Sequence, residues 1–203
     1  MKFSVKLFNF YGTPVHLKLW FLLLFFWLNP VYILAIFISI LLHELGHAFM
    51  AHRLGYKVHN IYVDIFNGAA IIDLDKMDNK EQLKVVAAGP WVNMMLLSLS
   101  VFISAFFKNH FIWSMCVVNF LLLVFNILPI FPLDGGRLLR TYLKIKTNDE
   151  NKSIRISSWV SLLFSSALFV FYLTNFSLIM VVFSLIFILY ALKDLGYIKF
   201  PVQ

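Results

Sequence analysis

The stretch VYILAIFISILLHELGHAFMAHR, from Val31 to Arg53, decides the fold of this chain. Its first half is uncharged, and its second half holds a cluster of ionisable residues, His43-Glu44-Leu45-Gly46-His47. A helix of this length, at 1.5 Å per residue, is about 34 Å long, enough to cross a hydrocarbon core of about 30 Å. We therefore expect a membrane span over Val31–His52 that carries polar side chains toward the end nearer Arg53.

The composition of the whole chain indicates a membrane protein. Of 203 residues, 61% are hydrophobic and 13% charged, and the mean hydropathy is +0.84; soluble domains average about 25% charged residues. We expect one integral domain over residues 1–203, with the lipid bilayer as its solvent. The net charge of +7 does not require nucleic acid, because positive charges set orientation in membrane proteins. Cys116 is the single cysteine, which excludes an intrachain disulfide.

The apolar pattern predicts an all-α polytopic membrane protein with about six transmembrane helices and a small β-hairpin after the second. We place the spans at Val15–Leu28, Val31–His52, Val85–Phe107, Phe111–Leu128, Ile156–Leu173 and Phe176–Leu192.

The hairpin is predicted within Val58–Asp75, where apolar residues alternate on both sides of Asn67-Gly68. Asn-Gly between alternating runs is a strong hairpin signal. The hairpin could be a plain connection, or an edge strand that receives an extended substrate by β-augmentation. Both roles stay open.

The distribution of basic residues predicts the orientation. With the N-terminus inside, only Lys108 of the 17 Lys and Arg residues falls in an outer loop. This asymmetry agrees with the positive-inside rule. We therefore expect both termini, the hairpin and the mouth of the His43–His47 site on the cytoplasmic side.

The spacing of His43 and His47 suits a metal ion. Two histidines four residues apart on a helix project from one face, as zinc ligands do in HExxH peptidases. Glu44 lies between them and is placed to take a proton from a water activated by the metal. The alternative is a buried histidine pair with incidental hydrogen bonds, but ionisable groups inside a membrane helix usually serve a function.

A catalytic zinc site commonly has three protein ligands. Position 53, where soluble relatives of the motif have a third histidine, is Arg53. His52, Glu81 and Glu150 are weak candidates, because the first is rotated off the ligand face and the others lie in charged segments. Asp134 follows a proline-rich run and precedes Gly135-Gly136. It could reach a metal from irregular backbone at membrane depth, or it could cap a helix that begins after it.

Three motifs together resemble the site-2 protease family of intramembrane zinc metalloproteases. They are HELGH at His43–His47, AAGPxxN at Ala87–Asn93 and NxxPxxPLDGG at Asn126–Gly136, and they are most similar to the stage IV sporulation protein FB branch. The resemblance implies one Zn²⁺ per chain, bound by His43, His47 and Asp134, with Glu44 as general base.

The resemblance also implies what the protein acts on. It implies cleavage of a peptide bond in or near the transmembrane segment of a membrane-anchored protein, such as a pro-sigma or anti-sigma factor, in a bacterial cell membrane. Two departures from the family are expected: no CBS or PDZ domain, and Phe66-Asn67-Gly68 where a Gly-Gly pair is usual. A membrane zinc transporter and a non-catalytic homologue that binds membrane partners are the alternatives.

Two asparagines have open roles. Asn126 is a candidate side-chain donor to the oxyanion that develops during hydrolysis, or it makes an interhelical hydrogen bond. Asn93 has the same two interpretations.

Overall fold

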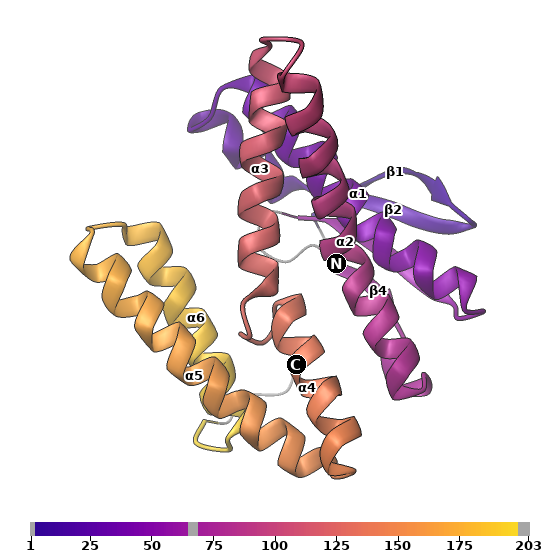
Figure 1. Cartoon of the computed structure of the whole chain (residues 1–203), viewed down its shortest axis with the longest axis vertical. Coiled ribbons are helices and arrows are strands. Elements are labelled where there is room, and N and C mark those ends of the chain that lie inside the picture. Colours follow the sequence, from indigo (N-terminus) through magenta and orange to yellow (C-terminus); the bar gives the residue numbers. More distant parts are fainter. Residues whose placement is uncertain (1–2, 65–68, 199–203) are drawn as a thin grey trace. The chain divides into compact units, whose positions relative to one another are not determined.

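The computed structural model describes residues 3–64 and 69–198, and it divides into two compact units, Met1–Val124 and Phe125–Gln203. Each unit is described by itself. Both are mainly helical, and the first also contains a four-stranded sheet (Figure 1).

The sheet of the first unit has the strand order β1-β2-β3-β4. Its strands are β1 (Ser4–Phe10), β2 (Thr13–Lys18), β3 (Val58–Val63) and β4 (Ala69–Ile72). β3 and β4 pair antiparallel, with Ile61 opposite Ala70, so the predicted hairpin is confirmed. Its Asn67-Gly68 turn lies outside the described residues. β4 is an edge of this sheet.

The first predicted span, Val15–Leu28, is not an α-helix. It consists of β2, which pairs antiparallel with β1 and parallel with β3, followed by a 3₁₀-helix, η1 (Leu19–Phe26). The two polar side chains of this segment find partners beyond β2: His16 stacks on Tyr62, and Lys18 forms a 2.8 Å ion pair with Asp64. The sheet satisfies the backbone of β2, as a helix would otherwise have to do.

β2 and η1 nevertheless match the length of the next helix, α1 (Pro30–Arg53). Six strand residues at about 3.3 Å and eight 3₁₀ residues at about 2.0 Å extend about 36 Å, and α1 extends the same distance at 1.5 Å per residue. The segment also contacts both halves of α1. Thr13 Oγ1 lies 3.2 Å from His52 Nε2, and the rings of Phe21 and Phe37 are 5.7 Å apart.

Four described helices are long and apolar enough to cross a membrane: α1, α2 (Asn79–Ser104), α3 (His110–Ile127) and α5 (Glu150–Thr174). The sixth helix, α6 (Leu178–Asp194), has 17 residues and falls just short of that length. The prediction of about six transmembrane helices is therefore not confirmed, although the membrane character of the chain is.

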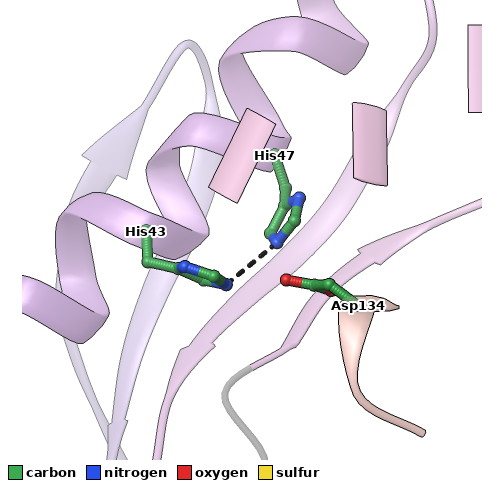
Figure 2. Close-up of side chains that lie close together, drawn as sticks. All are labelled: His43, His47 and Asp134. Atoms are coloured by element: carbon green, nitrogen blue, oxygen red, sulfur yellow. Dashed lines mark hydrogen bonds between the residues drawn. The ribbon is translucent and has the colours of Figure 1, made fainter. Parts of the chain in front are cut away.

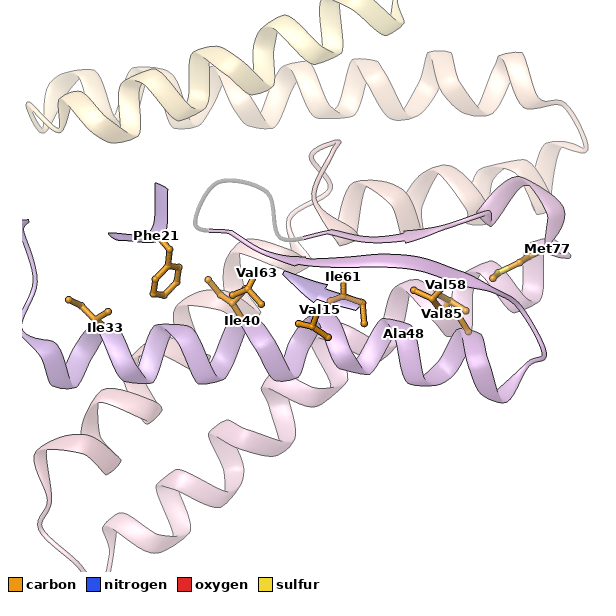
Figure 3. Close-up of a cluster of buried hydrophobic side chains, with 11 residues drawn as sticks. Val15, Phe21, Ile33, Ile40, Ala48, Val58, Ile61, Val63, Met77 and Val85 are labelled. Atoms are coloured by element: carbon orange, nitrogen blue, oxygen red, sulfur yellow. The ribbon is translucent and has the colours of Figure 1, made fainter. Parts of the chain in front are cut away.

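α1 is the centre of the first unit. Its start is set by Asn29, whose side chain accepts the Val31 N–H at 2.9 Å, and by Pro30 at the first helical position. Figure 3 shows the apolar core along one side of α1, where its buried residues meet β2, η1 and β3. α2 packs closely against α1 at Gly46, where a Cβ would lie 2.8 Å from Val92 and 3.0 Å from the Ala88 carbonyl.

The second unit holds α4 (Asp134–Thr147), α5 and α6. α5 and α6 lie side by side as a helical hairpin (Figure 1). One side of α5 is a row of fully buried serines: Ser153, Ser157, Ser158, Ser161 and Ser165. Ser161 accepts a hydrogen bond from the Phe131 N–H at 3.0 Å and donates one to the Pro129 carbonyl at 3.2 Å. This serine therefore holds the loop that leads into α4.

Candidate functional site

His43 and His47 lie one turn apart on α1, and both side chains are buried. The two rings are nearly perpendicular, and their Nε2 atoms lie 3.1 Å apart (Figure 2). Two nitrogens bound to one tetrahedral zinc ion at about 2.0–2.1 Å would be separated by about 3.3 Å. The predicted pairing of the two histidines on one face is confirmed.

The other ring nitrogen of each histidine faces a hydrogen-bond acceptor. His47 Nδ1 lies 2.8 Å from the backbone carbonyl of Val85, and His43 Nδ1 contacts Oδ1 of Asn93. A carbonyl oxygen can only accept, so each Nδ1 is the donor, and in a neutral imidazole this leaves the lone pair on Nε2. Two lone pairs that converge at this distance suit a bound cation. The donor set thus fits zinc, whose histidine ligands commonly donate their second N–H to a carbonyl or carboxylate.

Gly89 of α2 provides the space beside this pair. A Cβ at this position would lie 2.6 Å from His43 Nε2 and 2.6 Å from His47 Cε1, well inside van der Waals contact. Any larger residue would fill the volume beside the two Nε2 atoms. Sequence reasoning assigned no role to Gly89, although a glycine within an apolar helix is itself a signal of close packing.

Glu44 points to a different partner from the histidines. Its carboxylate is buried, and Oε2 accepts a hydrogen bond of 2.9 Å from the Ala70 N–H of β4. The edge strand of the sheet therefore orients this carboxylate. The hairpin is more than a plain connection, because it contacts the residue predicted to act as base.

Asp134 belongs to the second unit, where it is the first residue of α4, and its side chain is buried. The N-cap position is Leu133, so the alternative in which Asp134 caps a helix beginning after it is wrong. Gly135 and Gly136 let α4 start against the preceding loop. A Cβ on Gly135 would lie 2.5 Å from the Ile127 carbonyl carbon, and one on Gly136 would lie 2.6 Å from the Ile130 oxygen.

The weaker ligand candidates are engaged elsewhere. His52 contacts Thr13, and Glu150 forms a 2.8 Å ion pair with Lys144. Glu81 accepts a 2.6 Å hydrogen bond from the Tyr56 hydroxyl and raises the pKa of that tyrosine above its ordinary value. Asn126 is half-buried near the end of α3, and its proposed role stays a prediction.

Comparison with known proteins connects this geometry to a family. The chain matches the profile of peptidase family M50 over residues 31–109 and 108–168. A zinc metalloprotease of Methanocaldococcus jannaschii is 29% identical over 203 residues, covering 91% of this chain and 58% of that relative. The stage IV sporulation protein FB of Bacillus subtilis is 32% identical over 117 residues, covering 53% of this chain and 38% of that relative.

The similarity extends to three dimensions. The solved site-2 protease from Methanocaldococcus jannaschii matches with a TM-score of 0.73 and 28% identity, covering 99% of this chain and 98% of that one. The chain spans less than two thirds of the length of the curated relatives described above. These findings confirm the resemblance that the three sequence motifs indicated.

Proposed function

The chain belongs to peptidase family M50, and from this premise we propose that it is an intramembrane zinc endopeptidase. It hydrolyses a peptide bond in or near the transmembrane segment of a membrane-anchored protein. The observation that carries the proposal is the arrangement of His43 and His47, whose Nε2 atoms converge while both Nδ1 atoms face carbonyl acceptors.

His43, His47 and Asp134 together hold one zinc ion in this proposal. Two imidazoles and one carboxylate are a ligand set that zinc accepts, and the HELGH and PLDGG motifs that carry them support this assignment. The Asp134 carboxylate is buried at the start of α4, and a carboxylate oxygen is an ordinary zinc ligand. A bound zinc ion supplies Lewis-acid chemistry and makes water acidic enough to lose a proton near pH 7.

Glu44 accepts that proton as general base and later returns it to the leaving amine. The Ala70 N–H donates to one carboxylate oxygen, which leaves the second oxygen for the proton. Because Glu44 is buried, bulk water does not compete with the reacting water molecule for its carboxylate. One oxygen of Glu44 is thus held by the sheet, while the other takes part in proton transfer next to the histidines.

The substrate must present an extended backbone, because helical hydrogen bonds shield its carbonyl groups. Edge strand β4 can pair with such a segment by β-augmentation. Asn126 donates a hydrogen bond to the developing oxyanion in this scheme, and an interhelical hydrogen bond is its other assignment. By resemblance to the sporulation branch, the substrate is a membrane-tethered regulatory factor such as a pro-sigma or anti-sigma factor.

The orientation completes the proposal. The protein is an integral protein of the bacterial cell membrane, with both termini on the cytoplasmic side. The distribution of the 17 basic residues supports this orientation, since only Lys108 falls in an outer loop when the six predicted spans are counted with the N-terminus inside.

Replacement of Glu44 by Gln tests the proposed function. The variant should bind zinc as the wild type does but cleave a co-expressed single-span substrate at least about 100-fold more slowly, because the base is lost. Glu81→Gln is the matched control, since this glutamate accepts a hydrogen bond from Tyr56 instead of contacting the histidines, and it should cleave normally. Undiminished cleavage by Glu44→Gln would remove Glu44 from the mechanism.

A further inference from the structure

A series of buried hydrogen bonds joins three helices and ends at His43, one of the two proposed zinc-binding histidines. Asn93 of α2, Asn119 of α3 and Ser39 of α1 have no exposed surface. Asn93 Nδ2 donates to Asn119 Oδ1 at 2.9 Å, and Asn119 Nδ2 donates to Ser39 Oγ at 2.9 Å. Asn93 Oδ1 contacts His43 Nδ1 at the other end of this series. All of these groups lie within the first compact unit.

The donor and acceptor of each hydrogen bond in this series follow from one backbone group. The Met115 carbonyl, which can only accept, lies 2.9 Å from Asn119 Nδ2. The amide nitrogen of Asn119 must therefore face Met115 and Ser39, so its oxygen faces Asn93. Asn93 must in turn direct its own nitrogen toward Asn119 and its oxygen toward His43. The Met115 carbonyl thus determines which atom of Asn93 meets the histidine.

We propose that Asn93, held in this orientation by Asn119, is a positioning residue for the zinc site. Its Oδ1 accepts a hydrogen bond from the Nδ1–H of His43, which selects the tautomer with a lone pair on Nε2 and orients the ring toward the ion. This inference rests on the proposed function, because it assumes that His43 is a zinc ligand. His47 needs no such side chain, since the Val85 carbonyl accepts from its Nδ1 directly.

A purely structural role is the competing explanation. Buried asparagines join transmembrane helices by hydrogen bonds, and such a role predicts only that loss of the amide loosens the bundle. The two explanations differ for substitutions at position 93. A leucine fits an apolar interior but cannot accept a hydrogen bond from His43, whereas an aspartate can accept this hydrogen bond but places a carboxylate among buried groups.

The test measures zinc affinity and fold stability separately on the purified full chain in detergent. Zinc affinity is obtained by competition with a chelator, and stability by thermal unfolding of the zinc-free protein. For Asn93→Leu we expect zinc affinity to fall 10- to 100-fold, as for the loss of other partners of metal ligands. For Asn93→Asp we expect affinity at or above that of the wild type, together with lower thermal stability than Asn93→Leu.

Asn119→Leu provides a second route to the same question. It does not touch His43 but leaves the Asn93 amide free to turn its nitrogen toward the histidine, so zinc affinity should fall several-fold. Ser100→Ala is the matched control on α2, because the buried Ser100 hydroxyl donates within its own helix, to Leu97. This control should bind zinc as the wild type does.

The outcomes separate the inference from the proposed function. If the His43→Ala variant binds zinc as tightly as the wild type does, the proposed metal site itself is wrong. If wild-type binding depends on His43 but Asn93→Leu binds zinc equally well, the positioning role is wrong. Equal losses of affinity in Asn93→Leu and Asn93→Asp would also overturn it, because acceptor chemistry would then have no effect.

Discussion

Gly89 carries no functional group, yet its lack of a side chain keeps space open beside both histidines. A Cβ there would lie 2.6 Å from His43 Nε2. Alanine is the better helix former by about 1 kcal/mol, so Gly89→Ala should leave helix α2 intact. It should nevertheless lower zinc affinity at least about 10-fold by displacing a ligand ring. Chelator competition measures the effect, and unchanged affinity would show that α2 yields without disturbing the histidines.

The assignment of Asp134 as the third zinc ligand can be tested by a single substitution. Asp134→Asn keeps the size of the side chain and removes its charge, so zinc affinity should fall at least about 10-fold. Metal content after dialysis against a weak chelator gives the measurement. Asp73→Asn is the control, because Asp73 pairs with Lys76 and His59 at the surface. Equal zinc content in the Asp134 variant and the wild type would remove Asp134 from the ligand set.

At the scale of elements, α5 holds the loop before α4 through one hydroxyl. Ser161→Ala removes the acceptor of the Phe131 N–H and the donor to the Pro129 carbonyl. The loss of such a bond is about 1 kcal/mol, which corresponds to roughly fivefold faster amide exchange at Phe131. Ser165→Ala is the matched control, since the Ser165 hydroxyl bonds only carbonyl groups of α5. Equal amide exchange at Phe131 in the two variants would show that Ser161 does not hold the loop.

The N-terminus of α5 is expected to depend on pH through Asp149. The Lys152 N–H donates to this carboxylate at 3.0 Å and lowers its pKa below the ordinary value. The cap therefore contributes at pH above the unfolded-state pKa, and its contribution is lost as pH falls through the lower folded-state pKa. Asp149→Ala should speed amide exchange at Lys152 at pH 7, and the difference from the wild type should vanish in strong acid. If the two proteins still differ in amide exchange at Lys152 in strong acid, the carboxylate of Asp149 is not the group responsible for the pH dependence.

At the scale of the whole molecule, the proposed orientation predicts which loops face outward. In a Cys116→Ser background, a cysteine at Lys108 should react with an impermeant maleimide in intact cells. A cysteine at Lys146 should react only after permeabilisation. Serine keeps the size of the buried Cys116 side chain, and its hydroxyl can donate to a carbonyl of the preceding turn of α3. The reverse labelling pattern would invert the proposed topology and place the termini outside.

Much of this architecture could be predicted from local pattern. The apolar length of Val31–His52, the Asn-Gly hairpin signal and the His-Glu-x-x-His spacing each depend on neighbours in sequence, and the structure confirms helix, hairpin and histidine pair. The segment Val15–Leu28 could not be predicted this way. Its strand forms because β3, about 40 residues later, pairs with it, and hydropathy does not distinguish strand from helix.

The sequence alone determined the chemistry of the protein: a membrane-embedded chain with two histidines and a glutamate at zinc-peptidase spacing. That information is local, since one helical turn brings His43 and His47 together. Only the tertiary structure decided how those groups are oriented. The Val85 carbonyl, the amide of Asn93 and the Ala70 N–H reach the site from other elements. Their hydrogen bonds depend on packing between helices and sheet, which no spacing along the chain encodes.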